Sequence, residues 1–192
     1  DDLIATYARH AVEQGFDVTI VSSDKDLMQL VGPGVRMMDP MKNKFIGPDE
    51  VVEKFGVGPD KVIDVQSLAG DSTDNVPGVP GIGIKTAALL LEEYGDLDTL
   101  LARAGEIKQN KRRENLIEFA DLARISRDLV TLRRDVPVDH KIADFQKKRP
   151  DPEVLIPFLE EQGFRTILSK VRSEFGIDAP AAASPDTATA PG

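Results

Sequence analysis

Six aspartates could do chemistry together, and they stand in three pairs: Asp1 with Asp2, Asp24 with Asp26, and Asp71 with Asp74. If the turn that holds the third pair is helical, Asp71 and Asp74 lie on one face, about 5–6 Å apart. Two carboxylates about 4 Å apart repel each other by about 4 kcal/mol at an effective dielectric near 20, so a group of converging carboxylates needs cations. The chain has no cysteine and only two histidines, which favours Mg²⁺ or Mn²⁺ over Zn²⁺. Two such ions about 4 Å apart would activate a water and stabilise the leaving oxygen of a phosphodiester.

The segment that follows the third pair is a turn rich in glycine and proline, and an apolar helix comes directly after it. Glycines allow the backbone to approach another molecule closely. The start of the helix offers free N–H groups and the positive end of its dipole, which suit a phosphate. The candidate contacts to a nucleic-acid backbone are Gly78, Gly81, Ile82, Gly83, Lys85 and Thr86 in this segment, and Lys111, Arg112 and Arg113 further along. A solvated helix face explains the last three equally well.

The charge of the chain is uneven. The net charge is −9 over 192 residues, but residues 103–149 carry 13 basic and eight acidic side chains. Residues 1–102 carry eight basic and 18 acidic ones. An acidic half beside a basic segment fits a metal site next to a phosphate-binding surface, and it fits a charged helix bundle as well.

Each acidic pair taken alone also has an ordinary structural explanation, which is helix capping. Asp24 is a good N-cap, Asp1 and Asp2 complement a helix dipole, and Asp71 can cap a turn. The metal interpretation therefore depends on convergence of the pairs in space.

The elements around these residues predict an α/β sheet followed by a helical region. The sheet elements are a helix at Leu3–Gln14, a buried strand at Phe16–Val21, a short helix at Lys25–Leu30, a strand at Val35–Met38 and an edge strand at Lys44–Ile46. The helices expected beyond residue 48 are Asp49–Phe55, Asp60–Ala69, Lys85–Tyr94, Leu97–Arg103, Lys111–Ser126, Arg127–Arg133, Asp151–Gln162 and Thr166–Phe175. Asp24 and Asp26 follow the strand directly, at the sheet edge where ligand sites of α/β folds lie. Asp1 and Asp2 are expected at the same edge.

Three segments carry a resemblance to a known family: Asp1–Ala5, Ser23–Leu30 and Gly70–Ala87. In this order and spacing they closely resemble the 5′-nuclease domain found in bacterial DNA polymerase I, of the 5′–3′ exonuclease/flap endonuclease family. The resemblance implies a PIN-like α/β parallel sheet with a helical helix–hairpin–helix (H3TH) region, at about residues 70–95, that grips duplex DNA. It implies two Mg²⁺ or Mn²⁺ ions and a K⁺ ion at the helix–hairpin–helix.

The resemblance also implies roles for the acidic residues. Asp24, Asp26, Asp71 and Asp74 match the family's second-metal cluster, and Asp1 and Asp2 match acidic residues of the first-metal side. The family has further acidic residues and a basic helical arch that would precede residue 1. We therefore expect residues 1–47 to be the C-terminal part of the nuclease core, and this chain to be inactive alone.

Residues 48–176 are expected to form the helical region, and the Ala/Pro-rich residues 177–192 a linker or tail. The function that the resemblance implies is hydrolysis of DNA, or of an RNA primer strand, at nicks and 5′ flaps, by a monomer in the bacterial cytoplasm, associated with the nucleoid and without membrane contact. The alternatives are a non-catalytic duplex-binding module and a stand-alone 5′–3′ exonuclease.

Overall fold

The computed structural model describes residues 1–177, which form two compact units: residues 1–144 and the residues from 145 onward. The expected linker, residues 177–192, lies outside the described residues from residue 178 on. The boundary expected at residue 47 falls inside the first unit. No helix in the described part of the chain is long and apolar enough to span a membrane.

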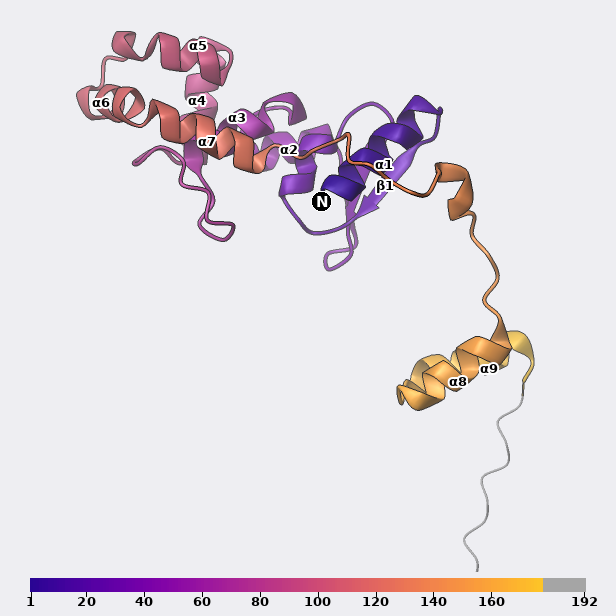
Figure 1. Ribbon diagram of the computed structural model, residues 1–192. Coiled ribbons are helices and arrows are strands. Elements are labelled where there is room, and N and C mark those ends of the chain that lie inside the picture. The colour runs from indigo at the N-terminus through magenta and orange to yellow at the C-terminus, as the bar shows by residue number, and fades with distance from the viewer. Residues whose placement is uncertain (178–192) are drawn as a thin grey trace, which may run out of the picture. The chain divides into compact units, whose positions relative to one another are not determined.

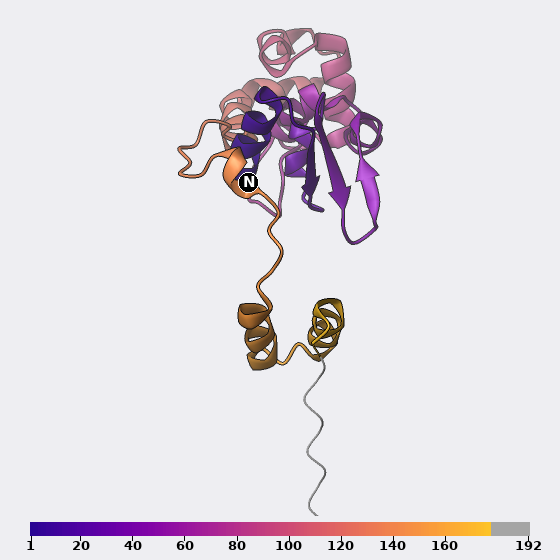
Figure 2. The same ribbon diagram turned by 90° about the vertical axis from the view of Figure 1, so that its right-hand side faces the viewer.

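A small sheet with helix α1 (Asp2–Glu13) beside it opens the first unit (Figure 2). Strand β1 (Val18–Val21) pairs in parallel with β2 (Val35–Asp39), so that Val18 lies opposite Val35. Strand β3 (Lys44–Ile46) pairs with β2 in the antiparallel sense. The expected parallel pair is confirmed, and β3 runs antiparallel because residues 40–43 are too few for a crossover. The helix expected at residues 25–30 is a 3₁₀ helix, η1 (Asp26–Leu30).

Helices make up the rest of the first unit (Figure 1). They are α2 (Pro48–Phe55), η2 (Pro59–Lys61), α3 (Val62–Ala69), α4 (Ile84–Tyr94), α5 (Leu97–Ala102), η3 (Ala104–Glu106), α6 (Asn110–Glu118) and α7 (Ala120–Val130). The 3₁₀ helix η4 (Ile142–Phe145) spans the boundary between the two units. Helix α3 packs against both α4 and α7, and one continuous core joins the sheet to this bundle. The packing of α3 therefore fixes the start of the loop that follows it.

The expectation of one helix over residues 111–126 is wrong. At Phe119 the backbone departs from helical geometry (φ −103°, ψ 21°), and the chain divides there into α6 and α7. The Phe119 side chain packs against the core, to which buried Leu116 and Ala123 belong. These apolar positions have the spacing of one continuous helix, so the sequence pattern could not reveal the break.

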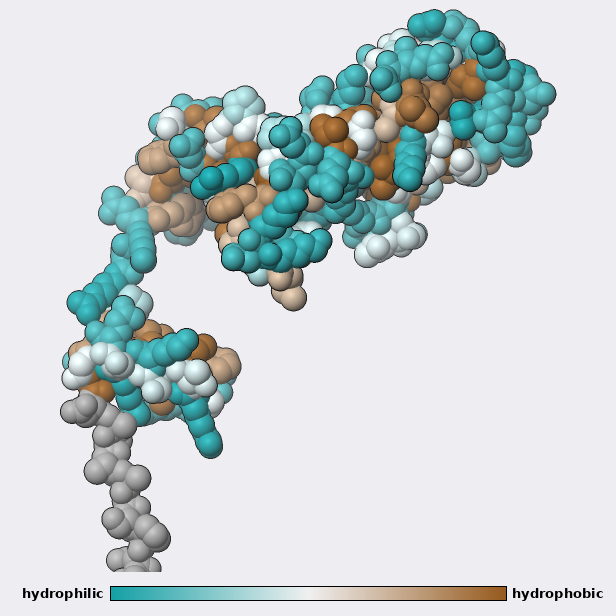
Figure 3. Space-filling model, turned by 180° about the vertical axis from the view of Figure 1, so that it is seen from behind, coloured by the Kyte–Doolittle hydropathy of each residue, from teal (hydrophilic) through white to brown (hydrophobic). Residues whose placement is uncertain are grey.

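The second unit is a pair of helices, α8 (Pro152–Glu161) and α9 (Arg165–Phe175), which pack against each other. Only Leu159 in these two helices is buried. Apolar side chains such as Phe158 and Ile167 stay half exposed, and Figure 3 shows hydrophobic groups on the surface of this unit. Two short helices have too little contact area to build a substantial core.

Candidate metal centre and nucleic-acid interface

Three of the six aspartates meet in space. Asp26, Asp71 and Asp74, here called the acidic cluster, each contribute a carboxylate oxygen that lies within 4.8 Å of the others. Asp26 begins η1, which follows strand β1, and the other two lie in the loop between α3 and α4. Asp71 and Val76 exchange two backbone hydrogen bonds of 2.8 Å, so this loop folds back on itself. The helical turn considered for Asp71 and Asp74 is absent, and a tight hairpin brings them together instead.

Two neighbours that the sequence reasoning did not single out hold the acidic cluster in place. Gln66 of α3 is 3% exposed, and its Nε2 donates a 2.5 Å hydrogen bond to Asp26 Oδ1. The ammonium of Lys25 forms an ion pair with the buried carboxylate of Asp71. A polar glutamine within the apolar stretch of α3 is a signal that could have pointed to Gln66, because a buried polar side chain needs a partner.

The half-buried carboxylate of Asp26 and the buried carboxylate of Asp71 respond differently to their surroundings. Burial raises the pKa of Asp26 above its ordinary value, and nearby Asp24 and Asp74 add to the rise, while the Gln66 bond opposes it. Burial also acts to raise the pKa of Asp71, but the bonds from Lys25 and from the Thr73 N–H outweigh it, so the net pKa of Asp71 is lowered. The acidic cluster thus combines one carboxylate that is costly to ionise with one that a cation keeps ionised.

The donor atoms of the acidic cluster fit a hard divalent cation. All three are carboxylate oxygens, the ligand type that Mg²⁺ and Mn²⁺ prefer. The Oε1 atom of Gln66 is buried and has no hydrogen-bond partner in the described part of the chain. A buried acceptor without a partner is costly to the fold, so it is consistent with a cation or water nearby.

The other three aspartates lie outside the acidic cluster. Asp24 Oδ1 accepts a 2.9 Å bond from the Asp26 N–H, which is an Asx turn just before η1. Asp2 Oδ1 accepts a 2.9 Å bond from the Arg133 N–H and so fastens the chain after α7 to α1. Asp1 stands at the N-cap of α1. A ligand role for Asp1, Asp2 and Asp24 stays a prediction.

The turn between α3 and α4, residues 70–83, is shaped by two glycines pressed against each other. Gly70 and Gly78 have φ values of +69° and +61°. A Cβ atom on Gly78 would lie 2.4 Å from the Gly70 nitrogen, and one on Gly70 would lie 2.7 Å from the Val76 carbonyl oxygen. Only glycine fits at either position, both for its left-handed backbone and for the missing side chain.

Side chains of helices α6 and α7 form hydrogen bonds with the backbone of this turn. The Gly78 N–H donates a 3.0 Å bond to Ser126 Oγ, and Asn115 Nδ2 donates a 2.7 Å bond to the Pro80 carbonyl. Gly78 is buried, so its N–H serves the fold. Nothing in the sequence pattern pointed to Asn115 or Ser126, because both are polar residues in amphipathic helices.

The outer part of the turn is open to solvent. Gly81, Gly83 and Lys85 are exposed, and Gly83 is the N-cap of α4. Ile82 is 4% exposed and anchors the turn in the core. The backbone N–H groups at the start of α4 therefore face outward beside Lys85, an arrangement that suits phosphate binding. Thr86 is half-buried behind them.

The basic residues expected on the later helix divide into two kinds. Lys111 is exposed, and Arg112 is half-buried. Arg113 donates 2.8 Å bonds to the Ile107 carbonyl and to Asn110 Oδ1, so it holds the start of α6. Contacts of these residues with nucleic acid stay predictions.

Comparison with known families identifies the class of protein that this fold and site define. Residues 1–56 match the family model described as "5'-3' exonuclease, N-terminal resolvase-like domain", and residues 57–153 match "5'-3' exonuclease, C-terminal SAM fold". The chain belongs to the 5′–3′ exonuclease family. The predicted resemblance is confirmed.

The similar curated proteins include bacterial DNA polymerases I. The Rhizobium leguminosarum DNA polymerase I is 59% identical over 181 residues, which cover 94% of this chain and 18% of that protein. The thermostable DNA polymerase I of Thermus aquaticus is 40% identical over 178 residues, covering 92% of this chain and 20% of that protein. The chain thus spans about a fifth of the length of these relatives.

Solved structures with the same fold come from nucleases. The 5′-exonuclease of bacteriophage T5 superposes with a TM-score of 0.62 at 23% identity, over 67% of this chain and 53% of that one. The catalytic core of Rad2, solved with a DNA substrate, superposes with a TM-score of 0.54 at 19% identity, over 82% of this chain and 55% of that one. The PIN-like sheet followed by a helical region is therefore confirmed as the fold.

Proposed function

We propose that this chain is part of the metal-dependent 5′–3′ exonuclease and flap endonuclease of a bacterial DNA polymerase I, and that it is inactive without the rest of the nuclease domain. The observation that carries the proposal is that one loop, residues 70–83, holds both Asp71 and Asp74 of the acidic cluster and the outward-facing backbone turn. A rigid loop of this kind fixes the distance between a cation-binding site and a phosphate grip. The polymerase relatives support the proposal.

The residues of the acidic cluster would hold the divalent cation, which supplies activation of water and stabilisation of the leaving oxygen when bound. Asp26 and Asp71 are fixed by Gln66 and Lys25, so that their oxygens are oriented before substrate arrives. The turn at Gly81 and Gly83 would bind the duplex backbone through main-chain N–H groups and so position it without reading bases.

The finer parts of the function also belong to the proposal. The substrate is duplex DNA with a nick or a 5′ flap, including an RNA primer strand, in replication and repair in the bacterial cytoplasm at the nucleoid. The cations are two Mg²⁺ or Mn²⁺ ions, with K⁺ at the helix–hairpin–helix, and the protein acts as a monomer. Asp1, Asp2 and Asp24 would complete the two-cation site.

The second candidate function is a duplex-binding module without catalysis. Its support is the turn, which could grip a duplex backbone with no metal at all. The acidic cluster opposes it, because three carboxylates beside a bound duplex repel its phosphates and serve no purpose in a pure binder.

Cleavage of a 5′-labelled flap duplex tests the proposal. The protein that contains this chain should cut the flap in Mg²⁺, whereas the Asp26→Asn variant should lose at least about a hundredfold in rate, the scale of losing a group that supports transition-state charge. Duplex binding, followed by mobility shift in EDTA, should remain within about twofold of wild type. Equal cutting by the two proteins would overturn the metal-centre assignment, and binding without any cutting by wild type would favour the second candidate.

A further inference from the structure

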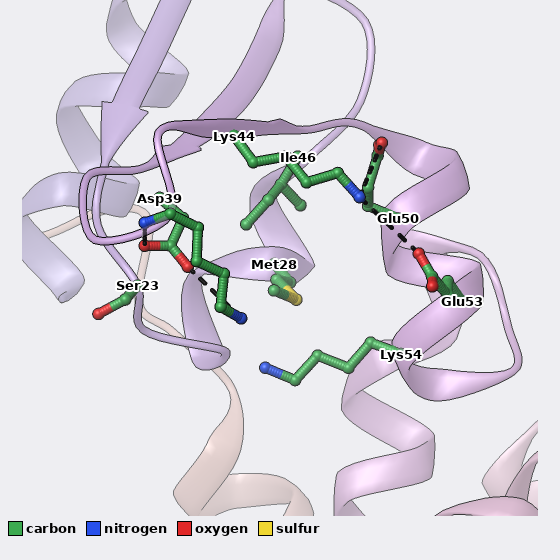
Figure 4. Close-up of a pocket in the computed structure, with 9 residues that line it drawn as sticks. Ser23, Met28, Asp39, Lys44, Ile46, Glu50, Glu53 and Lys54 are labelled. Carbon is green, nitrogen blue, oxygen red and sulfur yellow. Dashed lines mark hydrogen bonds and ion pairs between the residues drawn. The ribbon is translucent and has the colours of Figure 1, made fainter.

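A polar pocket lies near the acidic cluster. It has a volume of about 430 Å³ and lies between the sheet, η1 and α2 (Figure 4). We call it the lysine pocket, and its lining residues are Ser23, Met28, Asp39, Lys42, Lys44, Ile46, Glu50, Glu53 and Lys54. Ser23 immediately precedes Asp24, and Met28 belongs to η1, the same short helix that begins with Asp26. The pocket therefore opens at the same end of the sheet as the acidic cluster.

The carboxylates that line the lysine pocket already have partners. Asp39 Oδ1 accepts backbone N–H bonds of 2.9 and 3.2 Å from Met41 and Lys42, and the Lys42 ammonium lies 3.8 Å from Asp39 Oδ2. Lys44 lies between Glu50 and Glu53, at 3.7 and 3.9 Å, and Figure 4 shows these three side chains turned toward one another.

Lys54 differs from the other two lysines of the pocket, Lys42 and Lys44, which form ion pairs. It forms no ion pair with a carboxylate in the described part of the chain, and its side chain projects into the pocket below Met28 (Figure 4). Partial burial lowers the pKa of Lys54, and the positive charges of Lys25 and Lys42 lower it further. The carboxylates of Asp24 and Asp26 oppose this change, but neither forms an ion pair with Lys54. An anion in the pocket beside Lys54 would favour its charged form.

We propose that the lysine pocket binds an internal phosphate of the nucleic-acid strand, next to the linkage held at the acidic cluster, with Lys54 as its main contact. The inference rests on the proposed function and deepens it by adding a strand-binding subsite on the sheet side. Lysine is suited to this task as a compact charge that contacts phosphate without reading sequence. The Ser23 hydroxyl can donate a further hydrogen bond to a phosphate oxygen.

The test combines a lysine variant with removal of one phosphate charge at a time. Flap duplexes that carry a single neutral methylphosphonate, placed in turn at each linkage around the junction, are titrated in EDTA against wild type and Lys54→Met. Lys54→Met should weaken binding of unmodified DNA roughly fivefold to tenfold and reduce the slope of log K against log salt by about 1. At one internal linkage the methylphosphonate should weaken the binding of DNA by wild type by the same factor. At that linkage it should not weaken the binding of DNA by Lys54→Met any further.

Two further variants and one further substrate make the result specific. Lys54→Arg should restore the linkage-specific loss, and Lys170→Met, which removes one exposed charge from α9, should show no such coupling at that linkage. If the losses of affinity caused by Lys54→Met and by the methylphosphonate add at every linkage, the subsite is overturned. If the wild-type protein binds no DNA, the proposed function itself is overturned. Coupling only to a terminal 5′-phosphate, seen by comparing 5′-phosphate and 5′-hydroxyl ends, would also contradict an internal phosphate.

Discussion

The acidic cluster and the turn beside it share one loop but depend on different physical interactions. The acidic cluster is held by charge and side-chain hydrogen bonds, from Gln66 to Asp26 and from Lys25 to Asp71. The turn is held by shape, because Gly70 and Gly78 touch backbone to backbone. Changes of charge should therefore act mainly on cation binding and less on stability, whereas small changes of volume in the turn should act mainly on stability.

The largest effect is expected from Gly78→Ala. The new Cβ would lie 2.4 Å from a backbone nitrogen at a φ of +61°, and backbone atoms cannot move aside cheaply. We expect a loss of about 3 kcal/mol or more in the free energy of unfolding, measured by urea denaturation. Gly83→Ala is the matched control: apart from its chain neighbours, no heavy atom of the described residues lies within 4 Å of its Cβ position, so the loss should stay below about 1 kcal/mol. Equal losses would mean that the turn is not held by close contact.

The next effect concerns cation binding. Asp71→Asn combined with Asp74→Asn removes two of the three clustered carboxylates and should abolish the binding of Mn²⁺ seen by calorimetric titration. Duplex binding in EDTA should persist, because the part of the turn proposed to contact DNA, residues 78–83, is not substituted. Asp121→Asn, at a side chain that is 94% exposed, is the control and should bind Mn²⁺ like wild type. The same isotherm for the double variant and wild type would refute the metal-centre assignment.

A smaller effect is expected from Lys25→Met. It leaves the buried carboxylate of Asp71 without its cation, so the variant should lose about 1–3 kcal/mol of stability in EDTA. The variant lacks a positive charge that competes with a divalent ion. Saturating Mn²⁺ should therefore increase the stability of the variant more than it increases the stability of wild type. Thermal unfolding with and without Mn²⁺ measures both quantities. If Mn²⁺ stabilises both proteins equally, Lys25 does not compete with the cation.

The sequence predicted those parts of this comparison that depend on local pattern. The strands and most helices follow from hydrophobic spacing and residue type, and the structure contains them. Of the six aspartates singled out, the structure brings Asp26, Asp71 and Asp74 together. The motif of residues 70–87 was specific enough to indicate the family. The interactions of Asn115 and Ser126 with the turn were out of reach, because a polar residue on a helix does not reveal which distant carbonyl or N–H it will meet. The selection of Asp26 over Asp24 for the acidic cluster likewise depends on the direction of two side chains.

The smallest effect is expected outside both regions, at Asp64 of α3. Burial raises the pKa of this carboxyl, although it accepts a 3.2 Å bond from the Leu97 N–H. A raised pKa in the folded state means that the ionised form is disfavoured there, so Asp64 destabilises the fold at neutral pH and this cost fades as pH falls through its folded pKa toward the unfolded value of about 3.9. Asp64→Asn keeps an acceptor for Leu97 without the charge. We expect the variant to be more stable than wild type at pH 7 by roughly some tenths of a kcal/mol, which is at the lower end of the effects of single substitutions. The difference in stability should vanish near pH 4. Urea denaturation of both proteins across this range measures the difference, and a difference that grows as pH falls would show that the Asp64 charge stabilises the fold.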